Sequence, residues 1–175
     1  MSSRQVVLVL DYGSQYTQLI ARRIREAQVY CEIHPGTLTV DAIRKIAPRA
    51  IILSGGPSSV YDPEAPKSDP RLFDLGVPVL GVCYGQQLMA HQLGGKVEPS
   101  DEREYGPATV RVLHREGIFA PFEKDEELTV WMSHGDRLTE LPRGFEAVGK
   151  SDNAPLAAMA DAAELSRHWT WLTRL

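Results

Sequence analysis

The stretch VLGVCYGQQ at residues 79–87 decides the fold, because an apolar strand runs directly into a cysteine flanked by glycines. Gly81 and Gly85 lie two residues before and two residues after Cys83, where larger side chains would collide with neighbouring backbone. Residues 86–93 then have helical character. The stretch therefore predicts a strand, a sharp turn and a helix, in the form of a nucleophile elbow.

Cys83 is the candidate nucleophile of this turn. The predicted helix begins just after it, and the positive end of a helix dipole favours a thiolate over a thiol, which raises nucleophilicity at neutral pH. The alternative is a buried cysteine at a strand end with incidental glycines. Because the strand and both glycines occur together, we favour the nucleophile.

A nucleophile that transfers an acyl group needs hydrogen-bond donors for the oxyanion that develops. The backbone N–H of Tyr84 follows the nucleophile and is one natural donor. The glycine-rich loop SGGP at residues 54–57 follows a neighbouring strand and can offer the second. A simple strand-to-loop turn is the alternative interpretation of this loop.

The first half of the chain alternates strands with helices. Apolar runs predict strands at residues 6–10, 29–33, 50–53 and 77–82. The spacing of apolar residues predicts intervening helices at residues 16–27, 41–46 and 71–75. This alternation implies parallel strands. Ligands bind at the carboxyl ends of such strands, and three polar segments fall there together: residues 11–14, 54–59 and 83–87.

The second half has a different pattern, with short extended runs separated by turn residues. These runs predict strands at residues 108–113, 127–132, 145–148 and 156–159. We interpret them as β additions to the sheet of the first half. The expected fold is therefore α/β, with three flavodoxin-like α/β/α layers around a mixed, mainly parallel sheet.

The composition is that of an ordinary soluble domain. The 175 residues are 43% hydrophobic and 24% charged, with a net charge of −4, and this length fits one domain. Without a long apolar run, a signal peptide or a basic run, we expect neither a membrane nor a nucleic acid as a partner. Cys31 and Cys83 cannot form a disulfide framework, which favours a reducing cytoplasm.

Together, GVCYGQQ at residues 81–87 and SGGP at residues 54–57 resemble the class I, or triad, glutamine amidotransferases. Three further segments resemble the glutaminase domain of GMP synthetase: DYGSQY at residues 11–16, REYG at residues 103–106 and MSHGD at residues 132–136. The likeness covers about residues 5–161. As a set, these motifs are highly specific.

The resemblance implies that Cys83 attacks the side-chain amide of L-glutamine, giving a γ-glutamyl thioester and ammonia, and that water then releases glutamate. Gly56 and Tyr84 would supply the oxyanion N–H groups. The groups expected to bind glutamine are Gln87, Ser133, Gly135 and Asp136.

The same resemblance implies that ammonia passes to an ATP-pyrophosphatase domain or subunit that aminates adenylated XMP to GMP. ATP and magnesium would belong to that synthetase part, which this sequence lacks. We therefore expect no cofactor and no metal in the present domain.

The C-terminal end departs from the family pattern. The family takes its catalytic base and the group that orients it from a late His-Pro-Glu segment, whereas here His168 is followed by Trp169 and Thr170. We therefore expect residues 1–161 to be an amidotransferase domain that is incomplete at its C-terminus. Residues 162–175 are then an atypical tail, which a frameshift, an artificial ending or true divergence would produce. Of the other histidines, His134 is the best substitute for the base.

Two other functions stay open on the sequence alone. One is a catalytically impaired, amidotransferase-like module that binds glutamine or regulates a partner. The other is a different α/β cysteine hydrolase with the same elbow, which the segments at residues 11–16 and 133–136 disfavour.

Overall fold

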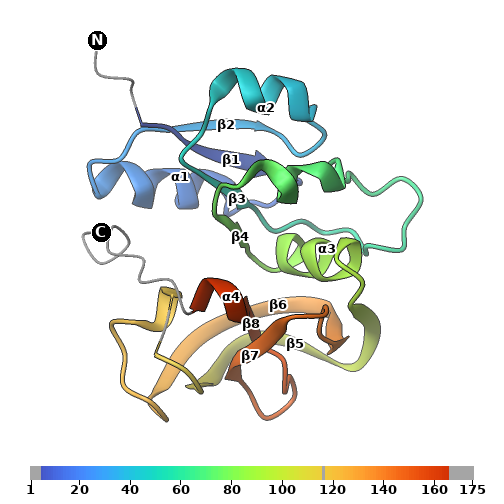
Figure 1. Cartoon of the computed structure of the whole chain (residues 1–175). Coiled ribbons are helices and arrows are strands. Elements are labelled where there is room, and N and C mark those ends of the chain that lie inside the picture. Colours follow the sequence, from blue (N-terminus) through green and yellow to red (C-terminus); the bar gives the residue numbers. More distant parts are fainter. Residues whose placement is uncertain (1–4, 116, 166–175) are drawn as a thin grey trace. The chain divides into compact units, whose positions relative to one another are not determined.

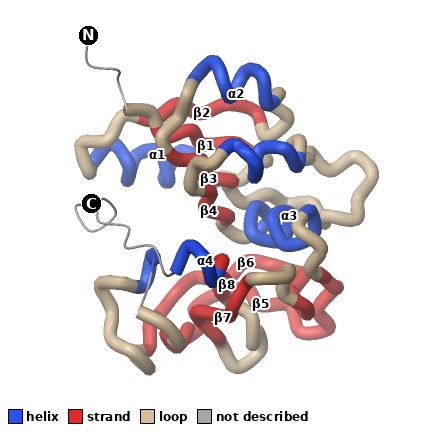
Figure 2. Tube along the Cα trace, viewed as in Figure 1, coloured by secondary structure: helices blue, strands red, loops and turns tan. Residues whose placement is uncertain are grey.

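A computed structural model describes residues 5–115 and 117–165. The chain divides into two compact units, Met1–Gln92 and Leu93–Leu175. Helices and strands alternate in the first unit, whereas strands dominate the second (Figures 1 and 2).

A parallel sheet forms the centre of the first unit. Its strand order is β2-β1-β3-β4, and the strands are β1 (Val7–Asp11), β2 (Cys31–Pro35), β3 (Ala50–Leu53) and β4 (Val79–Gly81). The consecutive residues Leu8, Val9 and Leu10 of β1 are all fully buried. Since successive side chains of a strand point to opposite faces, both faces of this sheet are covered.

The helices of the first unit are α1 (Thr17–Glu26), α2 (Val40–Ile46), the 3-10 helix η1 (Pro70–Leu75) and α3 (Tyr84–Gln92). Strand β2 lies on one side of β1, and the chain then crosses to the other side of β1 to form β3 and β4. Right-handed crossovers therefore place α1 on one face and α2 with η1 on the other. Figure 1 shows α1 and α2 on opposite sides of the sheet, and α2 contacts η1.

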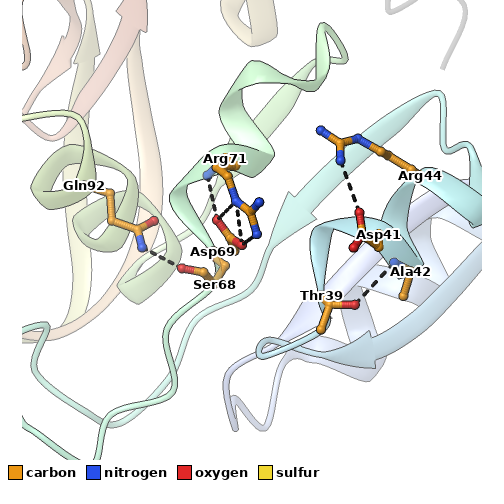
Figure 3. A network of polar contacts seen from close by, with 8 residues as sticks. All are labelled: Thr39, Asp41, Ala42, Arg44, Ser68, Asp69, Arg71 and Gln92. Atoms are coloured by element: carbon orange, nitrogen blue, oxygen red, sulfur yellow. Dashed lines mark hydrogen bonds and ion pairs between the residues drawn. The ribbon is translucent and has the colours of Figure 1, made fainter.

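Side-chain caps and ion pairs fix the ends of α2 and η1 (Figure 3). Thr39 accepts a hydrogen bond from the backbone N–H of Ala42, and Asp69 accepts one from the backbone N–H of Arg71. The Arg71 guanidinium lowers the pKa of the Asp69 carboxyl, and Arg44 on α2 adds to this effect. The charges of the two helices therefore attract each other weakly across solvent.

The second unit is built on an antiparallel sheet of order β6-β5-β7-β8. Its strands are β5 (Lys96–Val112), β6 (Glu127–Glu140), β7 (Phe145–Lys150) and β8 (Ala158–Asp161). Two short helices accompany them: η2 (Gly117–Phe119) and α4 (Ala162–Leu165). Val112, Phe119 and Val148 form its buried cluster.

The expected α/β class and the parallel sheet are confirmed, and every expected strand is present. The strands of the second half differ from the expectation of additions to the first sheet, because they pair with one another. The strand expected at residues 127–132 continues to Glu140, and its partner starts early, at Lys96. The pairing of β5 with β6 is irregular between Pro99 and Glu104, where the register shifts.

Ser54 joins the carboxyl ends of β1 and β3. Its backbone N–H donates to the Leu10 carbonyl at 3.0 Å. Its hydroxyl accepts from the Tyr12 N–H at 3.1 Å and donates to the Gly55 carbonyl at 2.9 Å. Ser54 is fully buried, so these bonds connect the two loops where water does not compete for them.

We expect Ser54→Ala to lower the free energy of unfolding by about 1–3 kcal/mol, because it leaves the buried N–H of Tyr12 without its acceptor. Urea unfolding followed by circular dichroism measures this change. Ser59→Ala is the matched control, since its hydroxyl accepts only an exposed hydrogen bond from Tyr61, and it should stay within about 0.5 kcal/mol of wild type. Equal losses in the two variants would contradict the role of Ser54.

Candidate active site

Cys83 lies in the sharp turn between β4 and α3 and has a left-handed backbone, with φ at 52°. Non-glycine residues rarely adopt this conformation, and such strain clusters at functional sites. A methyl group on Gly81 would lie 2.7 Å from the backbone of Gln86, and one on Gly85 would lie 2.3 Å from the Leu53 carbonyl oxygen. Both glycines are therefore required for the turn to close.

Hydrogen bonds fasten this turn on both sides. The Cys83 carbonyl accepts the first helical bonds of α3, from the N–H groups of Gln86 at 2.9 Å and Gln87 at 3.1 Å. The N–H of Gly85 donates to the Ser54 carbonyl at 3.0 Å. The start of α3 is thereby bound to the loop that follows β3.

The loops after β1, β3 and β4 converge on Cys83, as their position at the strand ends predicted. A methyl group on Gly55 would lie 3.4 Å from both the Cys83 Cβ and the Ser14 Oγ. A methyl group on Gly56 would lie 2.6 Å from the Tyr12 carbonyl oxygen. At Gly56 the loop thus approaches the Tyr12 backbone so closely that only glycine fits, whereas a methyl group on Gly55 would make ordinary contacts.

Burial raises the pKa of the Cys83 thiol above its usual value. The backbone N–H groups of Tyr84 and Gly56 hydrogen-bond toward the sulfur and oppose this rise. The donor at the helix start favours the thiolate, as expected, but desolvation of the charged form outweighs both donors, so the net shift of the pKa is upward.

The candidate site residues divide between the two units. Gly56, Cys83 and Tyr84 come together in the first unit, and Gln87 is buried one helical turn after Cys83. The others lie on β6 of the second unit, where Ser133 pairs with Tyr105 and Asp136 pairs with Pro99, with Gly135 between them. The two segments that the family resemblance marked, residues 103–106 and 132–136, are thus paired in one sheet.

Neither histidine of the first unit reaches Cys83. His34 pairs with Glu32 at 3.1 Å on β2. Strands β2 and β4 form the two edges of the sheet, and the three strand spacings between them amount to about 14 Å. His91 packs against Tyr61 and lies about 12 Å along α3 from the cysteine.

The remaining histidines lie in the second unit or beyond the described residues. His114 is exposed after β5, and His134 is on β6. His168, in the predicted atypical tail, lies outside the described residues.

Within residues 5–115 and 117–165, no group of three or more histidine, cysteine or acidic side chains could hold a metal ion. None of the helices in these ranges is both long and apolar enough to cross a membrane. Both cysteines are free thiols. Cys31 is buried, and its thiol contacts the Ala21 carbonyl at 3.4 Å.

Sequence reasoning misses the residues that support the site from β1 and β3. The sequence marks Ser54 only as part of a glycine-rich loop, although its hydroxyl joins two loops. The sequence marks Tyr12 and Ser14 only as members of the polar segment at residues 11–14 and of the DYGSQY motif, yet both lie against Gly55 and Gly56. Their position directly after buried strands is the one available signal.

The family model of class I glutamine amidotransferases matches residues 8–165. The chain belongs to the class I glutamine amidotransferase family. The match includes both units and all the residues of the candidate site. In this amidotransferase the strained cysteine, the glycine loop and the start of α3 form one arrangement within the first unit.

Known relatives and structures agree with this family. The chain is 57% identical to a glutamine-hydrolysing GMP synthase of Heliobacterium modesticaldum, over 90% of the chain and 30% of that protein. It is 52% identical to the enzyme of the same name from Chromobacterium violaceum, over 90% of the chain and 31% of that protein. The chain therefore spans about a third of the length of these curated relatives.

Among solved structures, it is similar to a protein described as a GMP synthase subunit from Thermoplasma acidophilum, with a TM-score of 0.74 and 26% identity. That match covers 90% of this chain and 78% of the other. A glutamine amidotransferase of Thermotoga maritima shares the fold, with a TM-score of 0.69 and 21% identity over 90% of this chain and 71% of the other.

We expect the alkylation of Cys83 by iodoacetamide to rise with pH through a midpoint above the ordinary thiol pKa of 9.0. The thiolate is the reacting species, and burial delays its formation. Peptide mass spectrometry measures the rate at Cys83 separately from that at Cys31, and Cys31→Ala is the control. A midpoint well below 9.0 would show that the donors at the helix start outweigh burial.

Proposed function

We propose that this chain is the glutaminase component of a GMP synthase, which hydrolyses L-glutamine through Cys83 to supply ammonia. One observation carries the proposal: the left-handed Cys83 lies between two backbone N–H groups, those of Gly56 and Tyr84, that are directed at its sulfur. A nucleophile beside two such donors has the geometry that acyl transfer requires.

In the proposed reaction, the Cys83 sulfur attacks the side-chain amide carbon of glutamine, and the thiol proton passes to a base. The N–H groups of Gly56 and Tyr84 stabilise the oxyanion that forms on the amide oxygen. Collapse of this intermediate breaks the carbon–nitrogen bond, and the nitrogen takes up a proton and leaves as ammonia. Water then attacks the γ-glutamyl thioester, which gives glutamate and restores the thiol.

The high pKa of Cys83 fits this sequence of steps. A buried thiol stays neutral until substrate arrives, so proton transfer to a base accompanies the attack. Stabilisation by the two N–H groups is then greatest when charge develops on the substrate oxygen.

The substrate is a zwitterion, so its binding needs both donors and acceptors. We assign Gln87 to this role because it is buried one turn after the nucleophile. From the family resemblance, we also propose that Ser133, Gly135 and Asp136 bind the α-amino and α-carboxylate groups, for which a carboxylate and a hydroxyl are suitable partners.

Ammonia has its use in a partner, which we propose to be an ATP-pyrophosphatase domain or subunit that aminates XMP to GMP. The identity of the relatives, which are glutamine-hydrolysing GMP synthases, supports this partner. ATP and magnesium belong to that partner, and the present domain works without a cofactor. A reducing cytoplasm suits a nucleophile that must remain a free thiol.

Ammonia release from L-glutamine tests the proposal, with the chain alone and with the ATP-pyrophosphatase part of a close relative. We expect release that Cys83→Ala abolishes and the matched variant Cys31→Ala retains. Release that survives Cys83→Ala would overturn the nucleophile. Glutamine binding in calorimetry without any release, with or without the partner, would instead indicate a glutamine-binding module.

We expect Gly56→Ala to lower kcat for glutamine hydrolysis by about 10²-fold, because one donor of the oxyanion hole is displaced. The added methyl group would lie 2.6 Å from the Tyr12 carbonyl oxygen, so the loop must move. Ser59→Ala, later in the same loop, is the control and should keep its kcat. A Gly56→Ala variant with wild-type kcat would show that the N–H of Gly56 takes no part in the reaction.

A further inference from the structure

Tyr12, at the carboxyl end of β1, contacts the segments that follow all three other strands of the parallel sheet. A methyl group on Gly36, in the turn after β2, would lie 2.4 Å from the Tyr12 ring. The backbone N–H of Tyr12 donates to Ser54 after β3. Its ring packs against the ring of Tyr84 after β4, with centroids 5.4 Å apart. Tyr12 therefore contacts one segment after each of the other three strands.

Tyr12 also contacts both residues whose N–H groups face the Cys83 sulfur. The Tyr12 carbonyl and Cβ lie directly against Gly56, within 2.6 and 3.2 Å of where a methyl group there would stand. The Tyr12 ring touches Tyr84, whose own hydroxyl is held by the Pro66 carbonyl at 2.8 Å. Tyr12 thus lies against Gly56 through its main chain and Cβ, and against Tyr84 through its ring.

The ring of Tyr12 packs against its neighbours, whereas its hydroxyl lacks a well-placed hydrogen-bond partner. Tyr12 is 2% exposed, and its hydroxyl has no hydrogen-bond partner of good geometry among the described residues. Burial raises the pKa of Tyr12 to about 12, although the Ser68 side chain opposes the rise. The phenol is therefore neutral at physiological pH.

We propose that Tyr12 is a positioning residue, whose ring sets the spacing of the Gly56 and Tyr84 N–H groups around Cys83. This role rests on the proposed function for its effect on catalysis. It extends that function by naming a residue that touches neither substrate nor nucleophile. The ring acts through its volume, so phenylalanine can replace tyrosine, whereas a smaller aliphatic residue cannot.

Two variants separate the ring from the hydroxyl. We expect Tyr12→Phe to keep kcat for glutamine hydrolysis within about threefold, because it retains the ring. We expect Tyr12→Leu to lower kcat by about 10–10²-fold with little change in KM, since a displaced oxyanion donor acts in the transition state. Tyr61→Leu is the matched control, because Tyr61 is an exposed tyrosine whose ring lies against His91, away from the residues that face Cys83.

A second readout does not depend on activity. The two N–H groups lower the pKa of Cys83, so moving them apart raises it. The midpoint of Cys83 alkylation should therefore move up by about 0.5–1 pH unit in Tyr12→Leu and stay unchanged in Tyr12→Phe. If the wild-type chain releases no ammonia with its partner, the proposed function fails, while alkylation still tests the role of Tyr12.

Gly36→Ala supplies the same test if Tyr12→Leu does not fold. Its methyl group pushes on the Tyr12 ring from the side opposite Tyr84, so it should lower kcat and raise the alkylation midpoint together. Wild-type kcat and an unchanged midpoint in a folded Tyr12→Leu or Gly36→Ala variant would overturn the proposal. A loss of kcat in Tyr12→Phe as large as in Tyr12→Leu would also overturn it, because the hydroxyl would then be the active feature.

Discussion

The left-handed backbone of Cys83 is the constraint on which the rest of the first unit depends. A cysteine at φ 52° is strained, and a strained residue persists only where its surroundings fix it. Here the surroundings are the backbone of Gln86 packed on Gly81 and the Leu53 carbonyl packed on Gly85. Strand β3 therefore helps to shape the nucleophile that follows β4.

The same close packing raises the pKa of the Cys83 thiol. Removing the sulfur from water penalises its charged form, and two backbone donors compensate for this penalty only in part. An arrangement that stabilises a resting thiolate completely would have less to offer the transition state. Donors that are fixed in place, and that act when charge moves to the substrate oxygen, favour the chemical step instead.

Much of the first unit could be predicted from the sequence, because its signals are local. The run VLVL in β1 contains no polar residue, so it indicates a strand buried on both faces. Gly81 and Gly85 mark the elbow through a steric rule that needs no knowledge of the fold. The convergence of the three loops followed from parallel topology alone.

The rest depends on contacts that a single sequence does not display. Residues 133–136 have the composition of a turn, yet pairing with β5 keeps them in an extended strand. The net direction of the Cys83 pKa depends on how deeply the sulfur is buried, which the motif does not specify. The hydroxyl of Ser54 and the ring of Tyr12 act on neighbours that are distant in sequence, so neither residue had a pattern to reveal it.

The most direct test of the central claim is a crystal structure of the chain after reaction with a chloroketone analogue of L-glutamine. We expect a covalent bond to the Cys83 sulfur, with the analogue's ketone oxygen accepting hydrogen bonds from the N–H groups of Gly56 and Tyr84. An adduct on Cys31, or one on Cys83 whose oxygen points away from both N–H groups, would contradict this claim.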